Sequence, residues 1–237
     1  MNGPITSMKL MAFMFKLSLL GSLAPVATAM QFGNLRNPFS SKQDGATTVA
    51  LTLALNVADR GSQSILSRLE TLAADADTTS AEGIAALCGD SALALLRARD
   101  SWVSCCGESR FRTRDEDALR IFDRIAIDEA AKFDDRDGGA TIDAALSAAG
   151  VNAGVEGPPT IAVVCAIATL MGDCERETGG VFQGDASSMQ QALQELASAA
   201  RAEDAVFAFE LLWVPGAEDE ALDLDEVLMD WPALMAC

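Results

Sequence analysis

The sequence predicts an α+β fold in which helices cover one face of a four-stranded antiparallel sheet. Apolar residues alternate from Val49 to Leu55, as they do on one face of a strand. They recur at helical spacing from Ile65 to Leu72. With one extra helix set aside, the predicted order is β-α-β-β-α-β, which is typical of the split βαβ, ferredoxin-like plan.

The first half of the predicted domain contains two strands and three helices. A strand over residues 47–55 leads into a helix over 61–74. Ser80 can accept the first backbone N–H groups of a second helix, residues 81–96. A second strand follows over 100–112. The charged amphipathic segment 115–133 is expected to be the extra helix, inserted between the second and third strands.

The second half supplies the other two strands. Pro158 and Pro159 precede residues 160–171, an almost continuous apolar run that predicts a strand buried on both faces. Ser187 and Ser188 begin a predicted helix over 189–201, and a strand over 205–214 ends at Pro215. A last, C-terminal amphipathic helix is expected within residues 218–234.

The N-terminal residues 1–29 predict a cleavable signal peptide. Lys9 and Lys16 precede an uncharged run, residues 17–29, that ends in Ala-Thr-Ala. This run is shorter than the roughly 20 apolar residues that span a bilayer. Residues 30–46 have transit-peptide composition or form a flexible arm, and residues 47–237 are expected to form a single domain. Taken together, residues 1–46 predict import into a chloroplast by a bipartite targeting signal. Secretion is the alternative.

Charge and composition restrict the function more than they define it. The chain has 35 Asp and Glu against 17 Lys and Arg, a net charge of −18. Such a chain repels phosphate backbones and anionic lipids, so we expect no nucleic acid partner and no direct binding to anionic lipid. Basic proteins and cations are better partners.

Several kinds of chemistry are excluded because the chain contains no histidine. Ser-His-Asp and Cys-His nucleophiles and histidine-containing metal sites are therefore ruled out. The loop starting at Asp135 lacks the donor spacing of an EF-hand, since Gly139, Ala140 and Leu146 occupy its fifth, sixth and twelfth positions. We expect no catalytic residues, cofactor or metal, and an enzyme built on carboxylates remains an alternative.

The adjacent cysteines Cys105 and Cys106 are the candidate redox residues. The six cysteines show no C-x-x-C spacing. Neighbouring residues in a strand point to opposite faces, so one of the two thiols is expected to be exposed. Arg110 and Arg112 follow closely, and a nearby guanidinium lowers the pKa of a thiol.

Several motifs follow one another in order from about Val49 to Leu234, and they include 76–83 (ADTTSAEG), 92–97 (ALALLR) and 210–215 (ELLWVP). In these motifs and their order the chain resembles a cyanobacterial and chloroplast family of unknown biochemical function that includes the plant fluctuating-light acclimation protein. The resemblance implies a plastid location and a role linked to photoprotection and thylakoid regulation. It implies no catalytic residues.

Together these observations predict a non-catalytic regulatory or assembly factor of the plastid or thylakoid. Its expected partners are proteins, thylakoid membrane proteins among them. The first alternative is a redox-responsive protein that uses Cys105 and Cys106. The second is a carboxylate-based enzyme of unknown substrate.

Overall fold

A computed structural model describes residues 44–134, 140–141, 159–216 and 221–237. The predicted signal peptide and most of the segment behind it lie outside the described residues, as does most of the loop that starts at Asp135. In the described part of the chain, seven strands form one antiparallel sheet of order β3-β6-β4-β1-β2-β5, with β7 also paired to β2. The strands are β1 (Ala46–Val57), β2 (Trp102–Arg112), β3 (Ala140–Thr141), β4 (Thr160–Met171), β5 (Phe182–Gln183), β6 (Val206–Val214) and β7 (Met235–Ala236).

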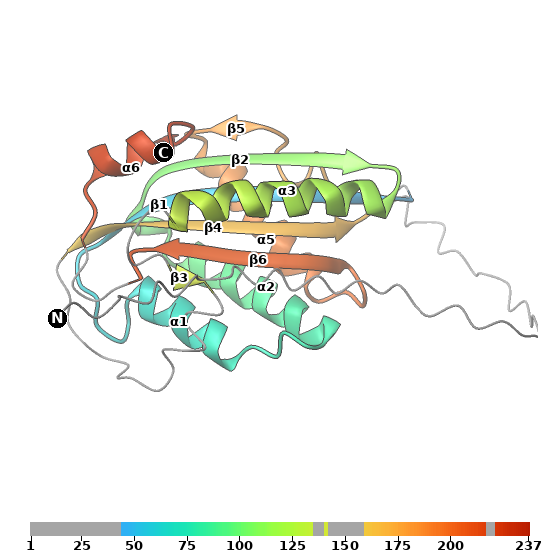
Figure 1. Cartoon of the computed structure of the whole chain (residues 1–237), viewed down its shortest axis with the longest axis horizontal. Helices are drawn as coiled ribbons and strands as arrows, with labels where there is room; N and C mark the ends of the chain where they lie inside the picture. Colours follow the sequence, from blue (N-terminus) through green and yellow to red (C-terminus); the bar gives the residue numbers. More distant parts are fainter. Residues whose placement is uncertain (1–43, 135–139, 142–158, 217–220) are drawn as a thin grey trace, which may run out of the picture.

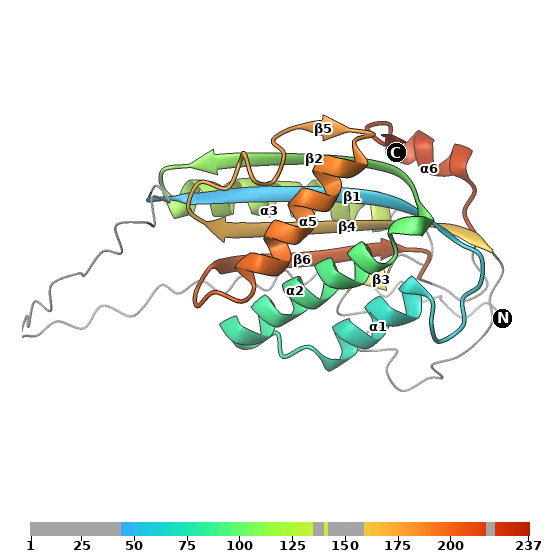
Figure 2. The ribbon, with the colours of Figure 1, turned by 180° about the vertical axis from the view of Figure 1, so that it is seen from behind.

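Five α-helices in the described residues accompany the sheet. They are α1 (Ile65–Asp75), α2 (Ala81–Arg97), α3 (Asp115–Asp134), α5 (Ala186–Ala199) and α6 (Leu224–Asp230). Figure 1 shows α3 lying along one face of the sheet, and Figure 2 shows α1, α2 and α5 on the other. The α+β class and the antiparallel pairing predicted from the sequence are confirmed.

The ferredoxin-like strand order is wrong. A split βαβ unit places another strand between the two strands that flank its first helix. Here β1 and β2 flank the first helical connection, yet they pair directly and antiparallel. The connection holds two helices, α1 and α2, with a short 3-10 turn at Arg99–Ser101. A second helix carries the chain back along the sheet, so β2 starts at the end where β1 stopped and runs the opposite way.

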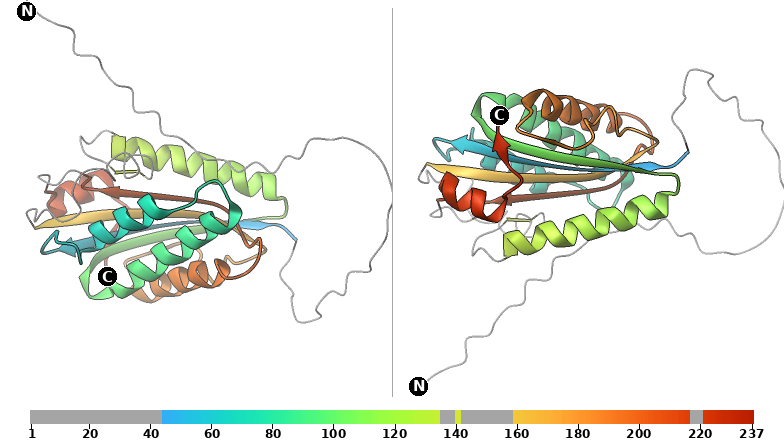
Figure 3. Two further views of the ribbon diagram at one scale, coloured as in Figure 1. Left: turned by 90° about the horizontal axis from the view of Figure 1, so that it is seen from below. Right: turned by 90° about the horizontal axis from the view of Figure 1, so that it is seen from above.

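The expectation that helices cover one face is also wrong, because β1 is buried on both faces. Leu51 and Leu53 belong to a core shared with α1, α2 and α5. Ala50 and Ala54 belong to a second core that includes residues of α3 and α6. The edge-on views in Figure 3 show the sheet as a layer between helices on each side.

Small residues on the second face let α3 pack closely against β1. Ala54 is fully buried there. The buried Thr48 satisfies its hydroxyl by donating from Oγ1 to the Ala118 carbonyl oxygen of α3, at 2.7 Å. A row of alanine and threonine resembles a solvent-facing row in sequence, although in this fold a helix covers it.

Capping residues explain where the helices begin. Ser80 caps α2 as predicted, accepting from the Gly83 backbone N–H at 3.1 Å. Ser64 caps α1, so that helix begins at Ile65 and not at 61. Asp185 accepts from the N–H groups of Ser187 and Ser188, which starts α5 three residues earlier than predicted.

A matched pair of substitutions on β1 tests the two-faced burial. Ala54→Leu should lower the free energy of unfolding by about 1–3 kcal/mol, because the larger side chain meets the packed helix. Asn56 lies on the same side of the strand and is exposed. Asn56→Leu should therefore change stability by less than about 0.5 kcal/mol. Urea unfolding measures both, and equal effects would contradict the packing described.

Candidate functional site

The structure places the predicted redox residues on opposite faces of β2. Cys105 is fully buried in the core shared with α1, α2 and α5. Cys106 is half-buried and packs against the core beneath α3. The two thiols therefore point away from each other, and each has its own surroundings.

Cys106 belongs to a row of three polar side chains that crosses the sheet. In register, Thr52 on β1 lies opposite Cys106 on β2 and opposite Cys165 on β4. The Thr52 hydroxyl lies 3.6 Å from the Cys165 sulfur, which is fully buried. We call Cys106, Thr52 and Cys165 the thiol row.

An ion pair on α3 affects the pKa of the two cysteines in the thiol row. Lys132 Nζ lies 2.6 Å from Glu129 Oε1, and the Glu129 side chain is only 17% exposed. The second oxygen, Glu129 Oε2, is buried and has no hydrogen-bond partner among the described residues. Both charges influence the titration of Cys106 and of Cys165. A carboxylate that is short of donors thus lies close to two thiols.

This environment keeps Cys106 protonated. Burial raises the pKa of its thiol to about 11, and the nearby Glu129 carboxylate contributes to the rise. Thr52 and Lys132 oppose the shift and are outweighed. Burial likewise raises the pKa of Cys105 and of Cys165. At neutral pH these groups are thiols and weak nucleophiles.

The expectation that arginines lower the pKa of these thiols is wrong. Arg110 makes an ion pair with Glu108 at 2.8 Å. Arg112 donates to the Phe111 backbone carbonyl at 2.6 Å. Both guanidinium groups contact neighbours on their own strand, and burial raises the pKa of both thiols.

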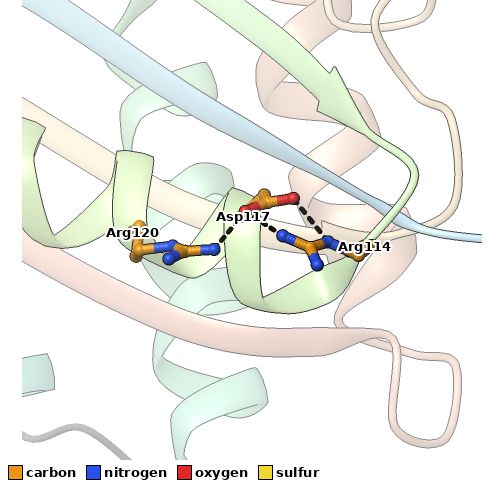
Figure 4. A network of polar contacts seen from close by, with 3 residues as sticks. All are labelled: Arg114, Asp117 and Arg120. Atoms are coloured by element: carbon orange, nitrogen blue, oxygen red, sulfur yellow. Dashed lines mark hydrogen bonds and ion pairs between the residues drawn. The ribbon is translucent and has the colours of Figure 1, made fainter.

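The start of α3 carries a compact charge network. Asp117 accepts from Arg114 Nε at 2.8 Å and Nη2 at 3.0 Å, and it also pairs with Arg120 (Figure 4). The hydrogen bonds from Arg114, supported by Arg120, lower the pKa of Asp117 to about 2. Negative charge in this first turn also stabilises α3, because it interacts favourably with the positive end of the helix dipole.

Two surface grooves offer polar linings elsewhere. A groove of about 610 Å³ beside α1 is lined by two guanidinium groups, Arg68 and Arg97, and by the Asp59 carboxylate. A second, of about 370 Å³, includes Glu82, Glu203 and Asp204 in its lining. Within the described ranges, no cluster of three His, Cys, Asp or Glu is arranged to hold a metal ion.

A helix that spans a bilayer needs roughly 20 predominantly apolar residues. The helices in the described part of the chain can be judged against that length and apolarity. None of them is long and apolar enough to cross a bilayer.

Glu129→Gln should make Cys106 more reactive. Removing the carboxylate lowers the pKa of the thiol, and each unit of pKa is roughly a tenfold change in thiolate below that pKa. We expect alkylation of Cys106 by iodoacetamide at pH 8.5 to accelerate about threefold to tenfold, as followed by site-resolved mass spectrometry. Lys132→Met should slow it. Glu116→Gln is the control, because Glu116 is exposed in the first turn of the same helix, and its rate should not change. An unchanged rate in Glu129→Gln would contradict the role of Glu129 in raising the pKa of Cys106.

Asp117→Asn should destabilise the fold in a pH-dependent way. The pKa of Asp117 is lowered in the folded state, from 3.8 to about 2, so its contribution is present above about pH 4 and is lost as the pH falls towards 2. The difference between wild type and variant in urea midpoints should therefore be largest near neutral pH and shrink below pH 4. Asp128→Asn, on an exposed position of α3, controls for the loss of one negative charge. A difference that persisted unchanged to pH 2.5 would speak against this network.

Comparisons with known proteins identify relatives of the chain. FLAP1 homolog A of Synechocystis sp. is 28% identical over 176 residues, which cover 70% of this chain and 50% of that protein. The chloroplastic FLUCTUATING-LIGHT-ACCLIMATION protein 1 of Arabidopsis thaliana is 25% identical over 224 residues, covering 93% of this chain and 54% of that protein. The chain thus spans about half the length of these relatives. No solved structure matches it.

A family model described as "Protein of unknown function (DUF1517)" matches residues 45–237. The matched range begins one residue before β1 and contains every helix and strand in the described part of the chain. The resemblance that the sequence motifs indicated is confirmed, and the chain belongs to the DUF1517 family.

Proposed function

We propose that this protein is a non-catalytic regulatory or assembly factor of the plastid that acts in light acclimation. The observation that carries the proposal is the match of almost the whole domain to relatives named for fluctuating-light acclimation. The Arabidopsis relative is chloroplastic by name, which supports a chloroplast address for this chain. Delivery by a bipartite signal in residues 1–46, and association with the thylakoid, belong to the same proposal.

The outer face of α3 is the contact surface that we propose for a protein partner. Ile127 is 56% exposed there, although isoleucine is usually buried. Arg124 and Asp128 flank it and are also exposed. An apolar anchor within a charged surround is the usual arrangement at the centre of a protein interface. With a net charge of −18, the chain favours a partner with a basic surface.

Capture from detergent-solubilised thylakoids tests the proposed role. The tagged full chain should recover a photosynthetic or transport protein, and recovery should fall as salt rises from about 50 to 500 mM. Ile127→Arg should reduce recovery at least tenfold. Val181→Arg replaces an aliphatic residue that is 76% exposed on another segment and should leave recovery unchanged.

A knockout strain moved between low and high light supplies the physiological readout. We expect slower recovery of photosynthetic yield than in the parent. If no such partner is captured and the knockout acclimates normally, the proposed role is wrong. N-terminal sequencing of the mature protein tests the address, because a second processing end near Lys42–Thr47 is expected after plastid import.

A redox response through Cys105 and Cys106 is the second candidate function. Cys106 is favoured within this pair, because it is half-buried whereas Cys105 is fully buried. Thiol trapping in illuminated and dark cells should show a change in Cys106 labelling. Cysteines that stay reduced and unlabelled in both states would remove this candidate.

A carboxylate-based enzyme is a third proposal, and it rests on the groove that includes Glu82, Glu203 and Asp204 in its lining. Binding of a small molecule to this groove, lost in Glu203→Gln, would favour it over the regulatory role.

A further inference from the structure

Two short strands pair with the edge of β2 that faces away from β1, and one follows the other at Cys105 and Cys106. β5 pairs with β2 at Cys106 and Gly107, and β7 pairs with β2 at Ser104 and Cys105. The two short strands therefore follow one another along the same edge, as Figure 1 shows for β5 and the end of the chain. The backbone of Cys105 also accepts from the Gly184 N–H at 2.8 Å, which ties the β5–α5 turn to this point.

β7 places Cys237 beside Cys105. The Cys237 N–H donates to the Val103 carbonyl at 3.0 Å, so the pairing continues one residue beyond β7. Cys237 then lies opposite Val103, and Cys105 is two residues further along on the same face of the sheet. The two thiols are therefore diagonal neighbours on one face of the sheet, and Cys237 contributes to the raised pKa of Cys105.

The surrounding packing holds β7 in this position. Gly184 has a φ of +64°, and a Cβ there would lie 2.6 Å from the Ala236 carbonyl oxygen and 3.0 Å from Met235 Cβ. The β5–α5 turn therefore lies directly against β7. On the other side, Trp231 and Leu234 are each 2% exposed in the core beneath α3. The segment that carries Cys237 is thus anchored just before the cysteine.

We propose that Cys105 and Cys237 form a reversible disulfide that fastens β7 to the edge of β2. Diagonal neighbours lie slightly farther apart than a disulfide requires, so the bond needs a shift of β7, a two-residue strand with exposed side chains, to bring the sulfurs to about 2.0 Å. The bond joins parts of the chain 132 residues apart in sequence, and a long closed loop favours a large stabilisation by a disulfide. This inference stands apart from the proposed role in light acclimation and from the Cys105–Cys106 pair.

The oxidant is a disulfide compound, such as glutathione disulfide or an oxidised dithiol protein. Cys237 is exposed and reacts first. Its thiolate attacks one sulfur of the oxidant, which forms a mixed disulfide and releases one thiolate. Cys105, after losing its proton, attacks the Cys237 sulfur and releases the second thiolate. Two electrons pass to the oxidant, and the protein loses two hydrogens.

Oxidation of the full-length protein tests the proposal. The protein is treated with glutathione disulfide, quenched with acid and then alkylated. Before alkylation we expect a mass lower by 2 Da than that of the reduced protein. After alkylation and digestion we expect a tryptic peptide that links residues 100–110 to the peptide ending at Cys237. That first peptide contains both candidate cysteines. The linked peptide should therefore persist in Cys106→Ser and vanish in Cys105→Ser. These two variants make the same substitution at adjacent positions.

Thermal unfolding supplies an independent readout. The oxidised wild type and Cys106→Ser should melt about 5–10 °C above their reduced forms. Cys237→Ser should show no such difference. A stable glutathione adduct on Cys237 without the internal bond would overturn the proposal, and so would a linked peptide that survives in Cys105→Ser. Neither outcome bears on thylakoid capture, so the two proposals fail separately.

Discussion

The structure depends on one constraint, which is that β1 must be buried on both faces along almost its whole length. It pairs with β2 on one edge and with β4 on the other, so it has no free edge over that length. Its leucines fill one core, and Thr48, Ala50, Thr52 and Ala54 face the other. Every helix of the described domain packs on one of those two cores, and a large side chain on the small-residue face would push α3 away.

The same constraint produces the thiol row and its chemistry. Because α3 covers the small-residue face, Cys165 is fully buried and Cys106 is half-buried beneath it. Burial therefore outweighs the effect of Lys132, and the pKa of Cys106 rises to about 11. On the opposite face, Cys105 is buried in a separate environment and its neighbour is Cys237. The two residues of one dipeptide thus lie in two separate environments.

Much of the local structure was predictable because it depends on neighbouring residues. The long strands and the helices α2 and α3 lie within about two residues of their predicted ends. The start of α5 was missed because Asp185 and not Ser187 accepts the first backbone N–H groups. The thiol row could not be predicted, since the row depends on strand register. Only the pairing of Thr52 with both Cys106 and Cys165 brings those residues together.

The sequence by itself determined the four long strands, most of the helices, the acidic charge and the family, because periodicity, capping residues and composition are local or additive properties, whereas the short strands β3, β5 and β7 were not predicted. Only the tertiary structure decided the strand order, the second layer of helices and the partners of the cysteines. The physical reason is that alternation in a strand reports which face a residue occupies, but not what covers that face. A row such as Thr48, Ala50, Thr52 and Ala54 suits water or a close-packed helix equally well, and here the packing of α3 decides between them.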